Sequence, residues 1–193
     1  MILLTNLKKS FFVLCILYSF TSYGQKSDST KFDLWVDAGI GAYGASSESG
    51  GFSPILGINL YHQETLYRIR YAHAYEFNLL GPSPSENLYS YGALLGKGVS
   101  TDKINLIFSA GLGITTGIIR GDLKEVHSGG GIISFRNEEY EKVYVFSPSI
   151  PLEVDMLFKT TKFFGLNFTL FADLNLKRPY LGWAVKLSIG KLK

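Results

Sequence analysis

Cysteine is almost absent from this sequence: one cysteine, Cys15, occurs among 193 residues, within an apolar segment near the N-terminus. A chain with no second cysteine forms no disulfide framework and offers no thiolate cluster for zinc. Long apolar runs are lacking too. The run over 10–20 has 11 residues, whereas a transmembrane helix needs about 20. The sequence therefore predicts neither a disulfide-stabilised scaffold nor a helical membrane span.

A strong net charge is also lacking. The formal net charge is +3, and Lys8 and Lys9 of the N-terminal segment account for two of these charges, so the remainder carries +1. No tract of basic residues marks a surface for phosphate backbones. We therefore expect no nucleic-acid partner.

The N-terminal segment has the layout of a secretory signal. Lys8 and Lys9 precede the apolar run, and Ser22 and Gly24 place small residues at the two positions that signal peptidase recognises. Export through such a signal removes the segment from the mature protein. The predicted divisions of the chain are a signal peptide over 1–24, a polar lead-in over 25–31 and one folded domain over 32–193.

From Phe32 onwards, apolar residues alternate with small or polar residues. The clearest example is 104–115, where Ile, Leu, Phe and Ala occupy one face and Asn, Ser, Gly and Thr dominate the other. A period of two indicates β-strands and does not suit an amphipathic helix. We predict eight strands, over 32–43, 53–61, 66–77, 88–97, 104–115, 140–158, 164–175 and 181–190.

The predicted connections alternate in length. Short polar turns fall at 62–65, 99–103 and 159–162. Longer segments rich in Gly, Ser or Pro fall at 44–52, 78–87 and 117–139, and the last connection, 176–179, is short. Outer-membrane barrels have short periplasmic turns and longer external loops. Their narrow interiors also suit the small residues of the non-apolar face. The predicted fold is all-β, an eight-stranded antiparallel transmembrane up-and-down β-barrel, in preference to a soluble lipocalin-like barrel.

Glycine-spaced aromatic strands such as 89–98 and 108–113, with a signal ending at 22–25, resemble the small outer-membrane β-barrel proteins around the OmpA transmembrane domain, OmpX and the opacity-type proteins. The resemblance covers the mature chain. It implies a location in the outer membrane of a Gram-negative bacterium, with outer-membrane lipid and lipopolysaccharide as partners. Members of this family end in an aromatic residue. This chain ends differently, at 189–193, so we expect its assembly signal slightly inside, at 182–187.

Several charged residues face the interior on this register. They are Asp33, Asp37, Arg68, Arg70, Glu76, Glu153, Asp155, Asp173 and Lys186. Buried charges are very costly unless they are paired, so we expect these residues to form ion pairs. Two interpretations stay open. The network is either a salt-bridged plug, which a barrel of eight strands favours, or an ion path with Arg68 and Arg70 as its positive side.

The histidines His62, His73 and His127 are the remaining candidates for chemistry. Outer-membrane lipid A deacylases of similar size use a serine two residues after a histidine. Here Ser128 directly follows His127, and neighbouring side chains of a strand point to opposite faces. His73 has Tyr75 at the corresponding spacing. We therefore expect no catalytic residues, no metal site, no cofactor and no enzymatic activity.

The longest predicted external loop, 117–139, carries charges of both signs. Its candidate contact residues are Arg120, Asp122, His127 and Arg136. Apolar residues within 132–135 are able to extend the flanking strands above the membrane, and an exposed strand edge captures other proteins by strand addition. We expect a non-enzymatic structural or surface-interaction role through the external loops, with an extracellular protein or surface ligand as partner. The alternatives are a narrow channel for ions or small solutes and, third, a lipid-modifying enzyme.

Overall fold

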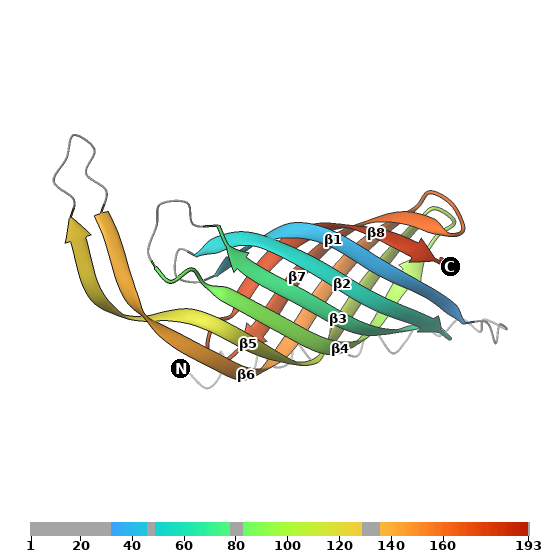
Figure 1. Ribbon diagram of the computed structural model, residues 1–193. Coiled ribbons are helices and arrows are strands. Elements are labelled where there is room, and N and C mark those ends of the chain that lie inside the picture. The colour runs from blue at the N-terminus through green and yellow to red at the C-terminus, as the bar shows by residue number, and fades with distance from the viewer. Residues whose placement is uncertain (1–31, 46–48, 78–82, 129–135, 193) are drawn as a thin grey trace, which may run out of the picture. The chain divides into compact units, whose positions relative to one another are not determined.

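The computed structural model describes residues 32–45, 49–77, 83–128 and 136–192, which form a β-barrel (Figure 1). The predicted signal peptide and lead-in lie outside the described residues, so both stay predictions. The strands are β1 (Asp33–Ala45), β2 (Gly50–His62), β3 (Thr65–Glu76), β4 (Asn87–Ser100), β5 (Ile104–Ser128), β6 (Arg136–Lys159), β7 (Phe164–Asn175) and β8 (Tyr180–Gly190). In the described ranges, no helix has both the length and the apolar character that a membrane crossing requires.

Each strand pairs antiparallel with the next, and β8 returns to pair with β1. The closing register runs from Trp35 opposite Gly190 to Ala45 opposite Tyr180. Closure satisfies the backbone hydrogen bonds at the edges that an open sheet would leave free, which is the condition for crossing a membrane with strands. The predicted fold of eight antiparallel strands in an up-and-down barrel is confirmed.

The barrel wall is apolar outside and polar inside. Along β8, Trp183, Val185 and Leu187 are exposed. The intervening Lys186 and Ser188 are buried in the interior. A soluble barrel has the opposite arrangement, because it buries its apolar face. An exposed apolar belt on a closed barrel is typical of a wall surrounded by lipid.

The two ends of the barrel differ in their connections. The β2–β3 turn consists of two residues, Gln63 and Glu64, with φ angles of 47° and 68°. Positive φ at both positions matches the type I′ turn, whose twist suits a tight β-hairpin. The start of β1 and the end of β8 lie at this end, which we call the short-turn end. We call the opposite end, which carries the longer connections, the long-loop end.

The predicted external loop 117–139 is wrong in its boundaries. β5 continues to Ser128 and β6 starts at Arg136, so most of this segment is a two-stranded hairpin that extends beyond the barrel (Figure 1). Its register shifts between Arg120 and Leu123 and again between Leu123 and Glu125. Both faces of the hairpin lie outside the barrel wall. Its sequence therefore lacks the apolar alternation that marks the other strands.

Two prolines lie within β6 without ending it. Pro148 is exposed on the outer face, opposite Ile114, whereas Pro151 is buried inside, opposite Asp173 of β7. Proline donates no ladder hydrogen bond, which predicts a bulge or a later start for the strand. The pairs on either side of Pro151 nevertheless keep one register, so β6 passes through both prolines without a shift there.

Candidate functional site

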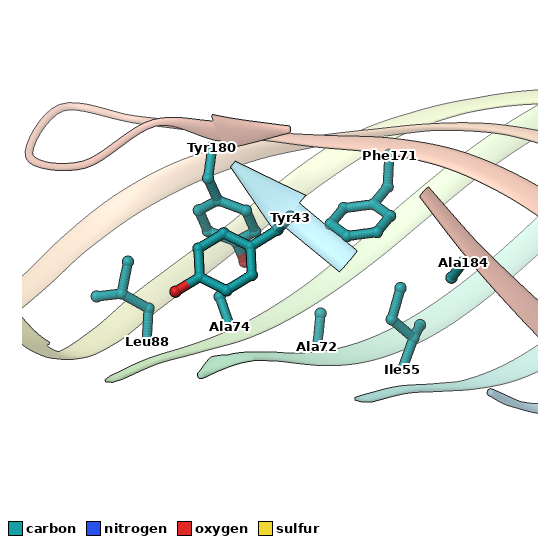
Figure 2. Close-up of a cluster of buried hydrophobic side chains, with 8 residues drawn as sticks. All are labelled: Tyr43, Ile55, Ala72, Ala74, Leu88, Phe171, Tyr180 and Ala184. Carbon is teal, nitrogen blue, oxygen red and sulfur yellow. The ribbon is translucent and has the colours of Figure 1, made fainter. Parts of the chain in front are cut away.

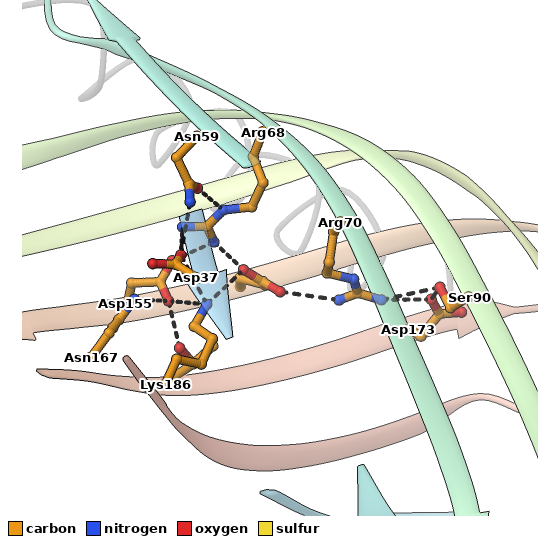
Figure 3. A network of polar contacts seen from close by, with 11 residues as sticks. Asp37, Asn59, Arg68, Arg70, Ser90, Asp155, Asn167, Asp173 and Lys186 are labelled. Atoms are coloured by element: carbon orange, nitrogen blue, oxygen red, sulfur yellow. Dashed lines mark hydrogen bonds and ion pairs between the residues drawn. The ribbon is translucent and has the colours of Figure 1, made fainter. Parts of the chain in front are cut away.

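A buried network of charges fills the middle of the barrel (Figure 3). Arg68 projects inward from β3, and its guanidinium contacts Glu153 of β6. The same group lies 2.5 Å from Asp155 and 3.5 Å from Asp37. Its Nε donates a hydrogen bond of 2.5 Å to Asn59. One guanidinium is therefore shared by three carboxylates from two different strands.

Lys186 approaches the same carboxylates from β8. Its Nζ lies 2.9 Å from Asp155, 3.6 Å from Glu153 and 3.7 Å from Asp37. Asp155 also accepts hydrogen bonds from hydroxyl and amide side chains of β7. The carboxylates are thus compensated by hydrogen bonds as well as by charge, which is the condition for tolerating buried ions.

Arg70 extends this network towards the long-loop end. Its guanidinium lies 3.4 Å from Glu153 and 3.1 Å from Asp173. Asp173 accepts further hydrogen bonds from Ser90 at 2.5 Å and from Thr115 at 2.8 Å. The central network therefore joins strands from all sides of the barrel. Its charged members are Asp37, Arg68, Arg70, Glu153, Asp155, Asp173 and Lys186.

Two apolar clusters share the barrel interior with the central network. The cluster at the short-turn end contains Trp35, Tyr61, Leu66, Ile107, Leu157 and Leu192. The cluster towards the long-loop end contains Tyr43, Ile55, Ala72, Ala74, Leu88, Phe171, Tyr180 and Ala184 (Figure 2). The order is visible along the inner face of β3, where Leu66 precedes Arg68 and Arg70, and Ala72 follows them. On β3 the two arginines thus lie between apolar residues, whereas on β7 Asp173 lies beyond Phe171, towards the long-loop end.

A second set of ion pairs lies at the long-loop rim. Glu76 receives two hydrogen bonds from the Arg120 guanidinium, at 2.6 and 2.7 Å. Glu86 accepts a hydrogen bond of 2.9 Å from Nε of Arg178. Burial alone would lower the pKa of Arg120, but the hydrogen bonds and the charge of Glu76 outweigh it and raise this pKa above its ordinary value. The first pair joins β3 to β5, and the second joins two connections at the barrel mouth.

The predicted site residues separate into distinct places. Asp33 lies apart from the central network and pairs with Lys191 at 2.7 Å, at the short-turn end. Arg120, expected as an external contact residue, has a side chain only 10% exposed and is held by Glu76. Asp122 is exposed on the hairpin. The backbones of His127 and Arg136 lie in β5 and β6, and their side chains are outside the described ones.

The sequence did not predict two residues of the long-loop rim, Glu86 and Arg178. Glu86 precedes β4 and Arg178 lies between β7 and β8, so neither belongs to an alternating segment. The Pro- and Ser-rich composition around Glu86 indicates a loop, and a loop carries no signal for the direction of a side chain. Only the fold brings these two residues together.

His73 lies on the outer wall of the barrel, on β3. Its ring stacks on Tyr89 with a centroid distance of 4.4 Å, and its Nε2 is 2.5 Å from the side-chain oxygen of Asn87. Tyr75 contacts the same ring edge-on at 6.1 Å. Among the described residues, no group of three or more His, Cys, Asp or Glu is placed to hold a metal ion.

Comparison with known proteins identifies the fold. No protein-family model and no curated protein matches the sequence. Among solved structures, neisserial surface protein A matches with a TM-score of 0.59 at 14% identity, over 82% of this chain and 96% of that one. The N-terminal β-barrel domain of OprF from Pseudomonas aeruginosa matches with a TM-score of 0.52 at 12% identity, over 82% and 96%. Ail, the attachment invasion locus protein of Yersinia pestis, matches with 0.50 at 9% identity, over 83% and 97%. The chain therefore has the eight-stranded β-barrel fold of the small outer-membrane proteins.

Proposed function

We propose that this protein is a non-enzymatic barrel of the bacterial outer membrane, with a closed interior, that contacts an extracellular protein through the β5–β6 hairpin. The observation that carries the proposal is the length of this hairpin. β4 pairs with β5 as far as Ile118, and β7 pairs with β6 as far as Ser149. Beyond these points β5 and β6 continue together to Ser128 and Arg136.

The hairpin presents strand edges outside the ring. At one point of β6, the Tyr140 N–H donates a hydrogen bond of 2.7 Å to the Ser83 carbonyl. On β5 the Arg120 N–H donates a hydrogen bond of 3.3 Å to Glu86, and in the described ranges the sheet register pairs β5 beyond Ile118 with β6 alone. Such an edge is a template onto which an extended segment of another protein adds as a strand.

The chemistry of the hairpin favours a protein partner. Between residues 120 and 142 the sequence has four basic and five acidic side chains, so the segment has no net positive charge to attract a polyanion. Leu123 is half exposed, and at the base of the hairpin Tyr144 is 75% exposed with Lys142 Nζ 5.3 Å from its ring centre. Aromatic and aliphatic groups among mixed charges are typical of protein interfaces.

The interior supports a closed barrel over the alternative, a narrow channel. A conducting path needs continuous hydration, whereas the charges of the central network are buried and paired, and apolar side chains fill the interior beside them. The third hypothesis, a lipid-modifying enzyme, needs a histidine beside a hydroxyl nucleophile and a carboxylate. The described partners of His73 are instead an amide and tyrosine rings. Two matching solved structures are named as a surface protein and an attachment invasion locus protein, which agrees with a surface role.

Shortening the hairpin tests this proposal. Arg120 and Lys142 are register partners, so an Asn-Gly turn joining them removes the extension and preserves the barrel. Cells displaying the native or shortened protein are measured for adhesion to a panel of immobilised purified extracellular proteins, with heparin as a polyanionic reference. We expect adhesion to at least one protein, and a loss of about tenfold or more on shortening.

A matched variant joins Ser128 to Arg136 through the same turn and removes only the tip. Because it keeps the paired strands, we expect it to retain adhesion. Equal adhesion of the native and shortened proteins, or adhesion to heparin alone, would contradict the proposal. Absence of adhesion to every protein of the panel would count against it as well.

A further inference from the structure

The outer wall of the barrel contains an apolar groove of about 740 Å³ across β1–β5. Ala93 of β4 forms the floor of the groove, because its register partners are the much longer Ile69 of β3 and Leu112 of β5. Leu112 is 77% exposed and stands clear of the wall. The side chains that line the groove include Leu56, Ile58, Ile69, Tyr71, Tyr91 and Leu112.

A ladder of polar and aromatic pairs continues from this groove towards the long-loop end. On the outer faces of β3 and β4, Tyr71 opposes Tyr91, and the next outward pair is His73 with Tyr89. The two tyrosine rings are 5.3 Å apart. Asn87 then bridges the second pair, since it contacts the His73 ring at 2.5 Å and donates to the Tyr89 hydroxyl at 3.4 Å.

This arrangement has the chemistry of a glycolipid site. A polar cluster on a lipid-facing wall is costly unless it lies at headgroup depth or binds a polar group. The groove takes an acyl chain at lipid depth, and the cluster above it offers an amide, an imidazole and tyrosine hydroxyls. Tyr75 and Tyr91 are 46% and 52% exposed, so their flat faces are available to a sugar ring.

The polar and aromatic cluster consists of Tyr71, His73, Tyr75, Asn87, Tyr89 and Tyr91. None of its members is a lysine or an arginine. Amide, imidazole and hydroxyl groups beside aromatic faces suit hydroxyl-rich sugars better than a bare phosphate. We propose that this wall binds one glycolipid of the surrounding leaflet, with an acyl chain in the groove over Ala93 and its sugar at His73 and Asn87. This inference rests on the proposed location in the outer membrane and is independent of the hairpin.

Native mass spectrometry of the refolded protein tests the site. The probes are purified lipid A and dioleoylphosphatidylglycerol, which has acyl chains and a phosphate but no sugar. We expect one lipid A molecule to be retained at detergent concentrations that strip the phospholipid. Ala93→Phe fills the groove from the lipid side and is expected to weaken lipid A retention about tenfold. His73→Phe keeps the stacked ring and is expected to remove the preference for lipid A over the phospholipid.

Ala172→Phe is the matched control, because Ala172 lies on the outer face of the opposite wall, between Leu152 and Leu181. It adds the same ring at a lipid-facing alanine and is expected to leave retention unchanged. A heat-dependent gel shift establishes that each variant is folded. Equal retention of lipid A by the Ala93→Phe and Ala172→Phe variants, equal binding of both lipids by the native protein, or a protein dimer in place of the lipid adduct would overturn the inference. The hairpin-shortened variant should retain lipid A, so failure of the surface role and failure of this site give different results.

Discussion

Replacing Arg68 by methionine is expected to lower the free energy of unfolding by about 3–5 kcal/mol, measured by urea unfolding of the barrel in lipid vesicles. Arg68 is buried and contacts Glu153, Asp155 and Asp37. Without its guanidinium, these carboxylates keep only part of their compensation in a site that water does not reach. The loss therefore reflects uncompensated buried charge more than the value of any one ion pair.

Two further variants make this prediction specific. Lys177→Met removes a positive charge from an exposed connection, and we expect a change within about 0.5 kcal/mol. Adding Glu153→Gln to Arg68→Met removes one carboxylate together with its partner, so we expect the double variant to be more stable than Arg68→Met alone. Equal effects of Arg68→Met and Lys177→Met would show that the interior charges are hydrated, against the account given above.

Replacing Gly41 by alanine is expected to destabilise the barrel by about 3 kcal/mol, the upper end of the usual cost of overpacking. Gly41 of β1 opposes Ala184 of β8 at the seam that closes the ring. A Cβ atom at Gly41 would lie 1.9 Å from the Trp183 carbonyl oxygen and 2.7 Å from the Cα of Ala184. Both contacts are with backbone, so the two strands must separate for the side chain to fit. The measurement is the fraction of protein that shows the heat-dependent gel shift after refolding.

Gly44 supplies the matched control, because it lies on the same strand and a Cβ there meets nothing within 4 Å. We expect Gly44→Ala to fold like the native protein, with a change within about 0.5 kcal/mol. If both alanine variants refold equally well, the close approach of β1 and β8 does not limit closure.

The alternation of side chains accounts for most of what the sequence predicts correctly. In the segment from Leu181 to Gly190, the period of two places Trp183 outside and Lys186 inside, as the structure has them. The rule works because lipid surrounds one face and a narrow polar interior confines the other. Each residue of the wall therefore meets one of two sharply different environments.

The rule fails where that contrast ends. The hairpin beyond Ile118 has no lipid face and no interior face, so its sequence lacks the apolar alternation and predicts a loop. Glu86 and Arg178 meet at the rim although they lie 92 positions apart, in segments that have no period. The groove over Ala93 depends on the register of three neighbouring strands, which no single segment of sequence contains.

The most direct test of the closed interior is single-channel conductance of refolded residues 25–193 in a planar bilayer. The buried, paired charges and the apolar side chains that share the interior with them predict a folded and electrically silent barrel. Discrete, reproducible openings that change when Arg68 and Arg70 are neutralised would contradict this account and support a channel.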